Sequence, residues 1–215
     1  CPVAVIWGAV PKVLVPVRGP TGGHSYFVAM HARDEVIRFI DGGDHTPLNF
    51  NIQRFDAVNE MALICVVLPE LKAGSNETSI WMYYGSQTAV AAEDVNGSYG
   101  PEQTLVYHFA DEKIPPLDST AYHNRSSQFD ASLNVATLIG NGAGFDGQHN
   151  FVIADAPVLV TDPAQGWTWS AWLKIDAEQV DATVFERGSN SLALAIDGTT
   201  LYARSVDAAG NPIET

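Results

Sequence analysis

Four polar residues of types that bind metal ions lie close together in the middle of the sequence: His108, Asp118, His123 and Asn124. Zinc sites use histidine, cysteine and carboxylate ligands, commonly as two closely spaced pairs on a rigid frame. The wide spacing of the two histidines does not fit that pattern. Asp118 and Asn124 offer oxygen ligands in one turn, so calcium is the candidate ion there. The alternative is that both side chains hydrogen-bond their own turn.

Aromatic side chains form the second group with a chemical use, since sugars stack on them. The stretch GWTWSAWLKI, residues 166–175, contains three of the five tryptophans. Strand alternation would place Trp167 and Trp169 on an apolar face, which predicts that they pack in a core. Trp172 falls on the polar face and is the better candidate for ligand binding. The alternative is that Trp172 covers neighbouring strands.

Trp81 and Tyr83 are further candidates for ligand binding. Both lie in TSIWMYYG, residues 78–85, which reads as a strand rich in aromatic residues. They give the first half of the chain an aromatic edge, and such an edge favours cover by other parts of the protein.

The charge of the chain excludes one class of partner. Its 215 residues carry 25 acidic against 11 basic side chains, a net charge of −14. An acidic surface repels phosphate backbones and anionic lipids, so nucleic acid is not an expected partner. No apolar run reaches the roughly 18–20 residues that span a bilayer, so no transmembrane segment is expected.

The two cysteines give little information about the compartment. Cys65 lies in the apolar run ALICVVLP and is expected to pack as a small buried hydrophobe. Cys1 is either the lipid-bearing first residue of a mature lipoprotein or only a boundary of the sequence.

The dominant pattern along the chain has the period of a β-strand. In residues 47–55, Leu48, Phe50 and Ile52 alternate with polar residues, which predicts a strand with one wet face. Further strands are predicted at 36–41, 61–69 and 78–85, and in the second half at TLVYHF, NFVIAD, WTWSAWLKI, ATVFERG, SLALAIDG and TLYARSV. Many short strands with turns between them predict an all-β fold of β-sandwiches.

The chain length and a loop-rich stretch suggest two domains. Residues 94–103 are rich in Gly, Pro and Asn, so the expected domains are a β-sandwich over 1–100 and a second β-domain over 104–215. The connecting residues 86–104 lack the composition of a free linker. They are therefore expected to lie on the surface of the fold.

The second half resembles the concanavalin A-like lectin/glucanase superfamily in its laminin-G-like branch. The ordered motifs are LVYHF, DSTAYHN, GAGFDGQHNFVIAD, GWTWSAWLKI, VFERG and LALAIDGTTLYAR. This resemblance implies a jelly roll over 104–215. The sequence stops before such a jelly roll would close, so the expected domain is partial and its parent protein longer.

The first half resembles a bacterial domain of unknown function that is often found ahead of lectin-like domains. The carrying motifs are VIRFID, PLNFNIQRFD, MALICVVLPEL and TSIWMYYG. Proteins of this build are extracellular, periplasmic or on the cell surface, and some are associated with MotA/TolQ/ExbB-type proton-channel subunits. The resemblance implies the same locations for this chain.

Catalysis is not expected from the acidic residues. Glucanases of this superfamily carry Glu-x-Asp-x-Glu, which puts two carboxylates on one face of a strand, about 5–5.5 Å apart for retention of configuration. Here AEDV and ADEK hold adjacent acids, which a strand points to opposite faces.

The sequence therefore predicts a non-catalytic module of the cell envelope or extracellular space that needs no cofactor. It would bind a glycan or a protein partner, or associate with itself in a surface assembly. The alternatives are an envelope component of an ExbB/TolQ-type proton-channel system and a glycoside hydrolase whose catalytic strand lies outside this sequence.

Overall fold

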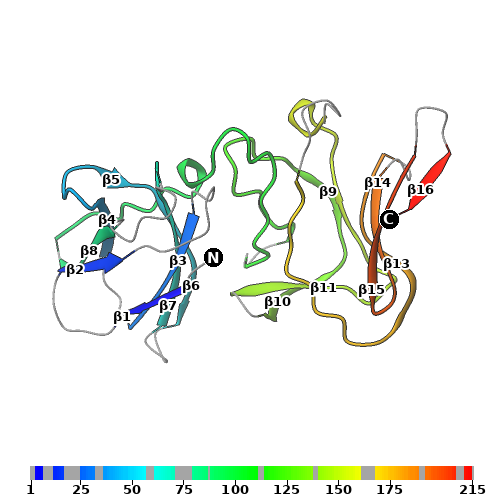
Figure 1. Cartoon of the computed structure of the whole chain (residues 1–215), viewed down its shortest axis with the longest axis horizontal. Coiled ribbons are helices and arrows are strands. Elements are labelled where there is room, and N and C mark those ends of the chain that lie inside the picture. Colours follow the sequence, from blue (N-terminus) through cyan, green and yellow to red (C-terminus); the bar gives the residue numbers. More distant parts are fainter. Residues whose placement is uncertain are drawn as a thin grey trace. The chain divides into compact units, whose positions relative to one another are not determined.

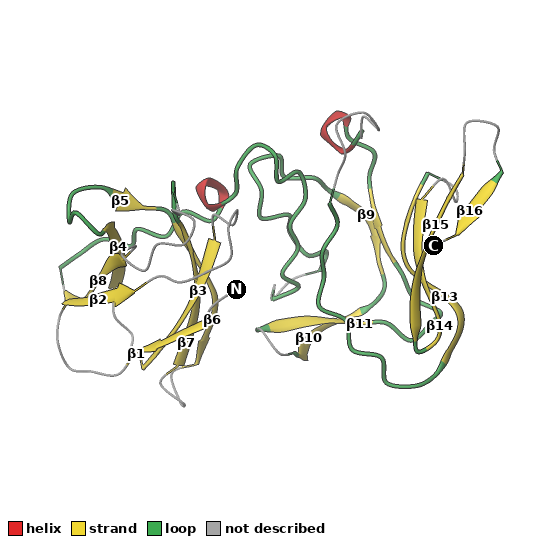
Figure 2. Cartoon of the chain, in the orientation of Figure 1, coloured by secondary structure: helices red, strands yellow, loops and turns green. Residues whose placement is uncertain are grey.

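The structure is a computed structural model. It describes the chain except residues 1–2, 7–11, 17–24, 32–35, 57–60, 71–78, 87, 111–113, 138–139, 161–167, 189–191, 207–210 and 215. The regular secondary structure of the described chain is nearly all β-strand (Figure 2), so the predicted all-β class is confirmed. It divides into two compact units, Cys1–Gly166 and Trp167–Thr215. Each unit is described separately below.

The strands and short helices follow the chain in a regular order. The first unit contains β1 Val3–Ile6, β2 Lys12–Pro16, β3 Ser25–His31, β4 Val36–Asp41, β5 Pro47–Leu48, β6 Phe50–Asp56, β7 Met61–Val67, β8 Ser79–Ser86, the 3-10 turn η1 Asn96–Ser98, β9 Ser126–Phe129, β10 Ser132–Ala136, β11 Asn141–Gly144, β12 Phe151–Ile153 and the turn η2 Pro157–Leu159. The second unit contains β13 Gln179–Arg187, β14 Leu192–Gly198, β15 Thr200–Val206 and β16 Pro212–Glu214.

The first strands build a β-sandwich, drawn in blue and cyan in Figure 1. One sheet has the strand order β1-β3-β7-β6 and the other the order β2-β8-β4-β5. All described pairs are antiparallel except β1 with β3. The core between the sheets holds Ile37 and Phe39 of β4, Leu48, Phe50 of β6, Ala62, Ile64 and Val66 of β7, Leu68, and Ile80 and Met82 of β8. The rings of Phe39 and Phe50 meet edge to face across the two sheets, 5.2 Å between centroids.

The predicted single strand at 47–55 is wrong in one respect, because the chain changes sheets within it. Leu48 pairs with Phe39 in one sheet, while Phe50 pairs with Val66 in the other. Asn49 lies between them as the crossing point. Both apolar residues still point into the same core, since that core lies between the two sheets.

The rest of the first unit is less regular. Strands β10 and β11 form one antiparallel pair, and β9 and β12 form another. The predicted strand at TLVYHF is wrong, since residues 103–110 have no regular secondary structure. They contribute Tyr107 and Phe109 to a group of rings with Phe129 and Phe151, in which Tyr107 and Phe151 have centroids 4.8 Å apart. Aromatic packing thus takes the place of a strand ladder here.

The second unit is an antiparallel sheet in the order β13-β14-β15-β16, with Ala193, Ala195 and Ile196 buried. The strands predicted at ATVFERG, SLALAIDG and TLYARSV are therefore confirmed. On one face Arg204 pairs with Asp181 at 2.7 Å and with Glu214 at 3.3 Å. Its guanidinium also lies over the ring of Tyr202.

The predicted strand at 167–175 is wrong for the residues that the structure describes. No described strand pairs with residues 168–177, so their backbone has no ladder and their alternating side chains have no sheet to pack on. Leu173 and Ile175, expected in a core, are 48% and 41% exposed. Trp169 is partly buried against Phe185, 5.4 Å between centroids. Trp167 lies outside the described residues.

The units also differ from the predicted domains 1–100 and 104–215, since residues 104–166 group with the sandwich. One reason is that His108 contacts strand β6, with its Nε2 3.1 Å from Gln53 Nε2. The open edge of β6 is also covered, by residues 93–94. The Glu93 side chain accepts a hydrogen bond from the backbone N–H of Ile52, and Asp94 N–H donates to the carbonyl of Phe50. Covering an open edge in this way prevents it from pairing with another chain.

Residues 88–99 lie on the sandwich, as the sequence predicted. Arg38 Nη2 donates to the carbonyl of Val90 at 2.6 Å, and Asn49 Nδ2 donates to the carbonyl of Gly97 at 2.8 Å. Ala92 also packs against the hydrophobic core, so both polar and apolar contacts hold the segment.

A glycine in the turn between β10 and β11 makes a further contact with β6 that can be tested. Gly140 has φ +66°, and a Cβ there would lie 3.2 Å from the carbonyl oxygen of Gln53. Gly147 has φ +82° with nothing near its Cβ position. Both Gly140→Ala and Gly147→Ala should lose about 1–2 kcal/mol for the left-handed backbone. Gly140→Ala should lose more, because its methyl group also pushes on β6. Urea unfolding of both variants measures the difference, and equal losses would show that Gly140 does not contact β6 closely.

Candidate functional site

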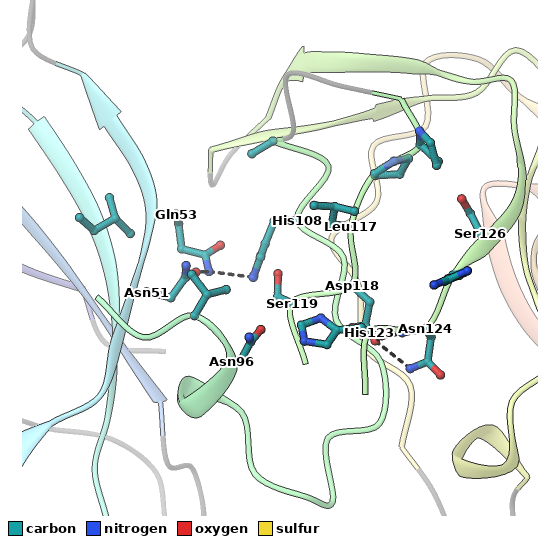
Figure 3. A pocket seen from close by; sticks show the side chains of 16 residues that line it. Asn51, Gln53, Asn96, His108, Leu117, Asp118, Ser119, His123, Asn124 and Ser126 are labelled. Carbon is teal, nitrogen blue, oxygen red and sulfur yellow. Dashed lines mark hydrogen bonds between the residues drawn. The ribbon is translucent and has the colours of Figure 1, made fainter. Parts of the chain in front are cut away.

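A cavity of about 630 Å³ lies in the first unit, within the range of small-molecule sites. One wall is β6 with Asn51, Ile52 and Gln53, next to Val95 and Asn96 at η1. The facing wall is built by His108 and by the segments Pro115–Ser119 and His123–Ser126. Figure 3 shows Asn96, Ser119 and His123 pointing toward the space between these walls. The cavity therefore has a mostly apolar lining of prolines and aliphatic side chains, in which amide, hydroxyl and imidazole groups are set.

Asp118 is the anchor of the facing wall. Its carboxylate is 4% exposed and accepts five hydrogen bonds. Oδ1 accepts from the N–H groups of Val106 and Thr120, at 3.0 and 3.1 Å. Oδ2 accepts from Thr120 Oγ1 at 2.8 Å and from Asn124 N–H and Nδ2 at 2.9 and 2.7 Å. One charge thus joins the irregular residues around 106, 120 and 124 into a rigid loop.

The pKa of Asp118 reflects two opposing effects. Burial raises the pKa of the carboxyl group, because it disfavours the charged form. The backbone N–H groups of Val106, Thr120 and Asn124 stabilise that charged form and outweigh burial, so the pKa is lowered from its usual value. Asp118 is therefore ionised at neutral pH.

The predicted calcium site at Asp118 and Asn124 does not fit this geometry. The structure does bring the two side chains together, but Asn124 presents its Nδ2 to Asp118, and the same NH2 group donates to the carbonyl of Thr104 at 2.8 Å. Five donors occupy the carboxylate oxygens that a calcium ion would need. Within the part of the chain that the structure describes, His, Cys, Asp and Glu also form no group of three that could hold a metal. The alternative of a turn that hydrogen-bonds itself agrees with the contacts.

His108 connects the facing wall with a polar network on β6. Its Nε2 lies 2.6 Å from the hydroxyl of Tyr99 and 3.1 Å from Gln53 Nε2. Gln53 Nε2 donates to Asn51 Oδ1 at 2.7 Å, and Asn51 Nδ2 donates to Glu93 Oε1 at 3.0 Å. Because the Gln53 amide nitrogen can only donate, His108 Nε2 must accept, and the ring proton is assigned to Nδ1.

Burial sets the protonation of this network. It lowers the pKa of His108 to about 4 and raises that of the Tyr99 hydroxyl. His108 is therefore neutral and Tyr99 protonated at neutral pH, as their hydrogen bond requires. The network fixes these side chains against β6, and neither the His108 ring nor the Tyr99 ring carries a charge.

The aromatic candidates lie away from this cavity. Ile80 and Met82 of β8 point into the core, so the alternating Trp81 and Tyr83 lie on the outer face of their sheet, where both are partly buried. The Tyr83 hydroxyl donates to Asp44 Oδ1 at 2.6 Å. Trp172 belongs to the second unit and is 75% exposed. None of the three lines the cavity.

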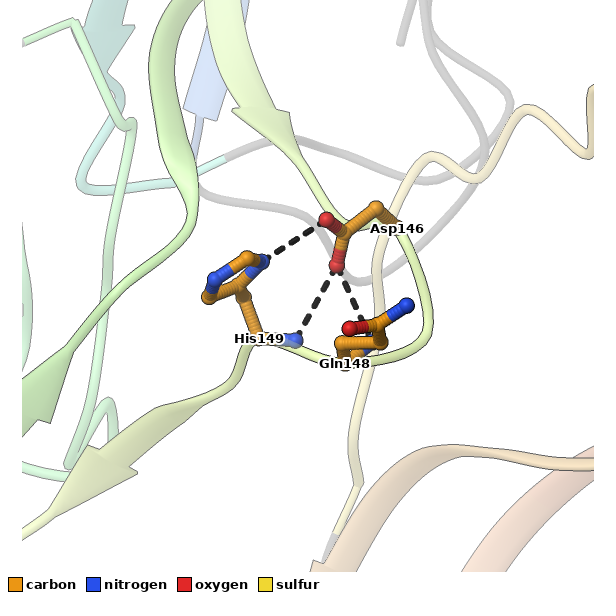
Figure 4. Close-up of polar contacts among 3 residues, drawn as sticks. All are labelled: Asp146, Gln148 and His149. Carbon is orange, nitrogen blue, oxygen red and sulfur yellow. Dashed lines mark hydrogen bonds and ion pairs between the residues drawn. The ribbon is translucent and has the colours of Figure 1, made fainter.

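A histidine–carboxylate contact lies in the turn between β11 and β12 (Figure 4). Asp146 accepts from the N–H groups of Gln148 and His149, and its other oxygen lies 2.7 Å from His149 Nδ1. The backbone hydrogen bond from Gln148 and then the contact with His149 lower the pKa of Asp146 to about 2. Both side chains are more than half exposed and line no cavity, so this contact stabilises a surface turn.

Residues 34–125 match the model of a protein family described as a domain of unknown function (DUF2341). The domain of unknown function expected for the first half is thereby confirmed. The match ends directly after Asn124, so it includes both the sandwich strands from β4 to β8 and the loop that Asp118 anchors. Residues 104–125, expected in the second domain, fall within it. No curated protein and no solved structure gives a significant match.

The anchoring role of Asp118 predicts a large loss of stability in Asp118→Asn. The substitution removes a buried negative charge from its donors and turns a new NH2 group toward them, which should cost about 2–4 kcal/mol at neutral pH. Asp146→Asn is the matched control, and its exposed turn should lose less. Urea unfolding measures both, and similar small losses would contradict the anchoring role.

The loss of stability in Asp118→Asn should become smaller in acid. Because the pKa of Asp118 is lower in the folded protein, its charge stabilises the fold above about 3.9, the ordinary value in an unfolded chain. That contribution disappears as the pH falls through the folded-state pKa. The difference between the native protein and Asp118→Asn should therefore narrow below about pH 4.

Proposed function

We propose that this chain is a non-catalytic binding module of the extracellular space or cell envelope, and that its ligand is a glycan. The observation that carries the proposal is that some polar groups of the cavity are bonded within the protein and others are not. Asn51, Gln53 and His108 are locked in one network, and Asp118 and Asn124 in another. Other polar groups that line the same cavity are left for a ligand.

The polar groups that neither network uses have the hydrogen-bonding properties that bind a sugar. Asn96, Ser119 and His123 can each donate and accept hydrogen bonds, as sugar hydroxyls do. His123 has φ +49°, an uncommon backbone conformation for a histidine. Its N–H donates to the carbonyl of Thr120, which is itself bound to Asp118. The anchored loop thus presents this imidazole at a fixed place on the wall.

The lectin-like character of the second half and an association with proton-channel proteins of the envelope are parts of this proposal that rest on the sequence resemblance. Self-association in a surface assembly is also part of the proposal. The described chain contains no helix long and apolar enough to cross a membrane.

The proposed lack of catalysis predicts that the protein releases no reducing sugar from β-glucans. Glycosidases use two carboxylates, and Asp118 is the one carboxylate among the described residues that line the cavity, with both oxygens fully hydrogen-bonded. Release of reducing sugar that is lost on a single carboxylate substitution, at unchanged melting temperature, would instead identify a hydrolase.

The proposed site predicts that His123→Ala weakens glycan binding. A glycan array with the whole chain should give defined ligands, and calorimetry should then show about tenfold weaker binding by the variant, because one direct hydrogen bond is lost. His149→Ala is the matched control, since this histidine of the same unit lines no cavity. If both variants bind like the native protein, the ligand lies elsewhere, and the outer face with Trp81 and Tyr83 becomes the next surface to test.

A further inference from the structure

Arg125 stands apart from the other arginines whose side chains the structure describes. Arg38 donates to Val90, Arg204 pairs with two acids, and Arg54 and Arg187 also have partners. Arg125 has no ion pair or side-chain hydrogen bond with the described residues, yet it lines the cavity. In a chain with 25 acidic and 11 basic residues, an arginine without any side-chain partner among the described residues is unexpected.

The side chain of Ser126, the next residue in the sequence, also lacks a described hydrogen-bond partner at this cavity. The Ser126 hydroxyl is buried and has no hydrogen-bond partner among the described residues, although it also lines the cavity. A buried hydroxyl without a partner costs free energy, and native proteins rarely leave one. An oxygen atom of a ligand would satisfy it. His123, Arg125 and Ser126 thus place three unused polar groups within four consecutive residues.

The backbone of these residues is fixed by the buried anchor. Asn124 lies between His123 and Arg125, and its N–H and Nδ2 both donate to Asp118. The Arg125 carbonyl accepts from the N–H of Ala154 at 2.8 Å. Holding the backbone at both points lowers the entropy lost when a ligand binds the side chains.

The local charge at the cavity differs from the charge of the whole chain. Both oxygens of the Asp118 carboxylate are occupied by its five donors, and His108 is neutral. Glu93 and Asp94 do not line the cavity. More distant acids are screened, because the Debye length is about 8 Å at physiological ionic strength. Arg125 is therefore the one arginine or lysine among the described residues that line the cavity, and its guanidinium is available to an anion.

We propose that the cavity binds a saccharide carrying a carboxylate, a hexuronic acid, with the carboxylate on the Arg125 guanidinium. A guanidinium binds a carboxylate through two parallel hydrogen bonds. The hydroxyls of Ser119 and Ser126 and the imidazole of His123 hold the sugar oxygens. This inference rests on the proposed glycan-binding function and names the class of glycan.

The test compares two probes that differ only in charge. Calorimetry with the whole chain would measure the binding of trigalacturonate and of its methyl ester, which keeps the sugar and removes the negative charge. The native protein should bind the acid about tenfold more tightly. Arg125→Gln should remove this preference, and Arg125→Lys should keep part of it, since lysine retains the charge without the planar fork.

The control is Arg187→Gln, which removes the same charge from β13 in the other unit and should leave the preference intact. Equal binding of acid and ester by the native protein and by Arg125→Gln would overturn this inference while the glycan-binding function stands. Binding of neither probe would also overturn it, and the glycan array would then decide the proposed function separately. Binding of a peptide through its free C-terminal carboxylate, with no saccharide bound in either experiment, would overturn both.

Discussion

The Asp118 carboxylate is buried, and a buried charge persists only where donors replace the water it has lost. Five donors do so here, and they come from residues that are distant in the sequence or belong to no helix or strand. Residues 104–110 and 114–125 therefore have a fixed conformation without a strand ladder. The family match ends at residue 125, where this arrangement ends. The matched region thus contains the sandwich strands β4–β8 together with the anchored loop.

Strand β6 provides the surface to which that loop is fitted. Its edge is covered at Phe50 and Ile52 by residues 93–94 and at Gln53 by Gly140. Its outward polar side chains form a network in which Gln53 contacts the ring of His108. The cavity lies between two walls, which the contact between Gln53 and His108 joins. Groups on the rim, such as His123 and Arg125, are left out of both networks, and that separation of structural from unused groups is the basis of the proposed binding role.

Much of the fold could be predicted from residue patterns, because alternation reports which side chains a sheet buries. It predicted β4, β7 and β8 and the three strands from β13 to β15. It did not show that the chain changes sheets at Asn49, since Leu48 and Phe50 face one core from two sheets and the alternation continues across the crossing. At 168–175 the alternation was present, but a strand also requires a neighbour, and no described strand pairs there.

The site was only partly predictable. The sequence brought Asp118 and Asn124 together as oxygen ligands for calcium, but it could not show that the asparagine presents its nitrogen. His108 was considered for zinc, while its burial beside Tyr99 depends on the folding of residues 93–108 onto β6. Arg125 was missed because a single arginine has no pattern. Its signal is a property of the structure, the lack of a partner in a chain rich in acids.

The central claim is that Asp118 holds the backbone at Val106, Thr120 and Asn124 in one conformation, and amide hydrogen exchange tests it most directly. The N–H groups of Val106, Thr120 and Asn124 all donate to this carboxylate and lie outside every strand of the described chain. They should exchange slowly, in the range of the core strand β7, and should become fast in Asp118→Asn. Fast exchange of these three amides in the native protein, at the rate of an open loop, would contradict the claim.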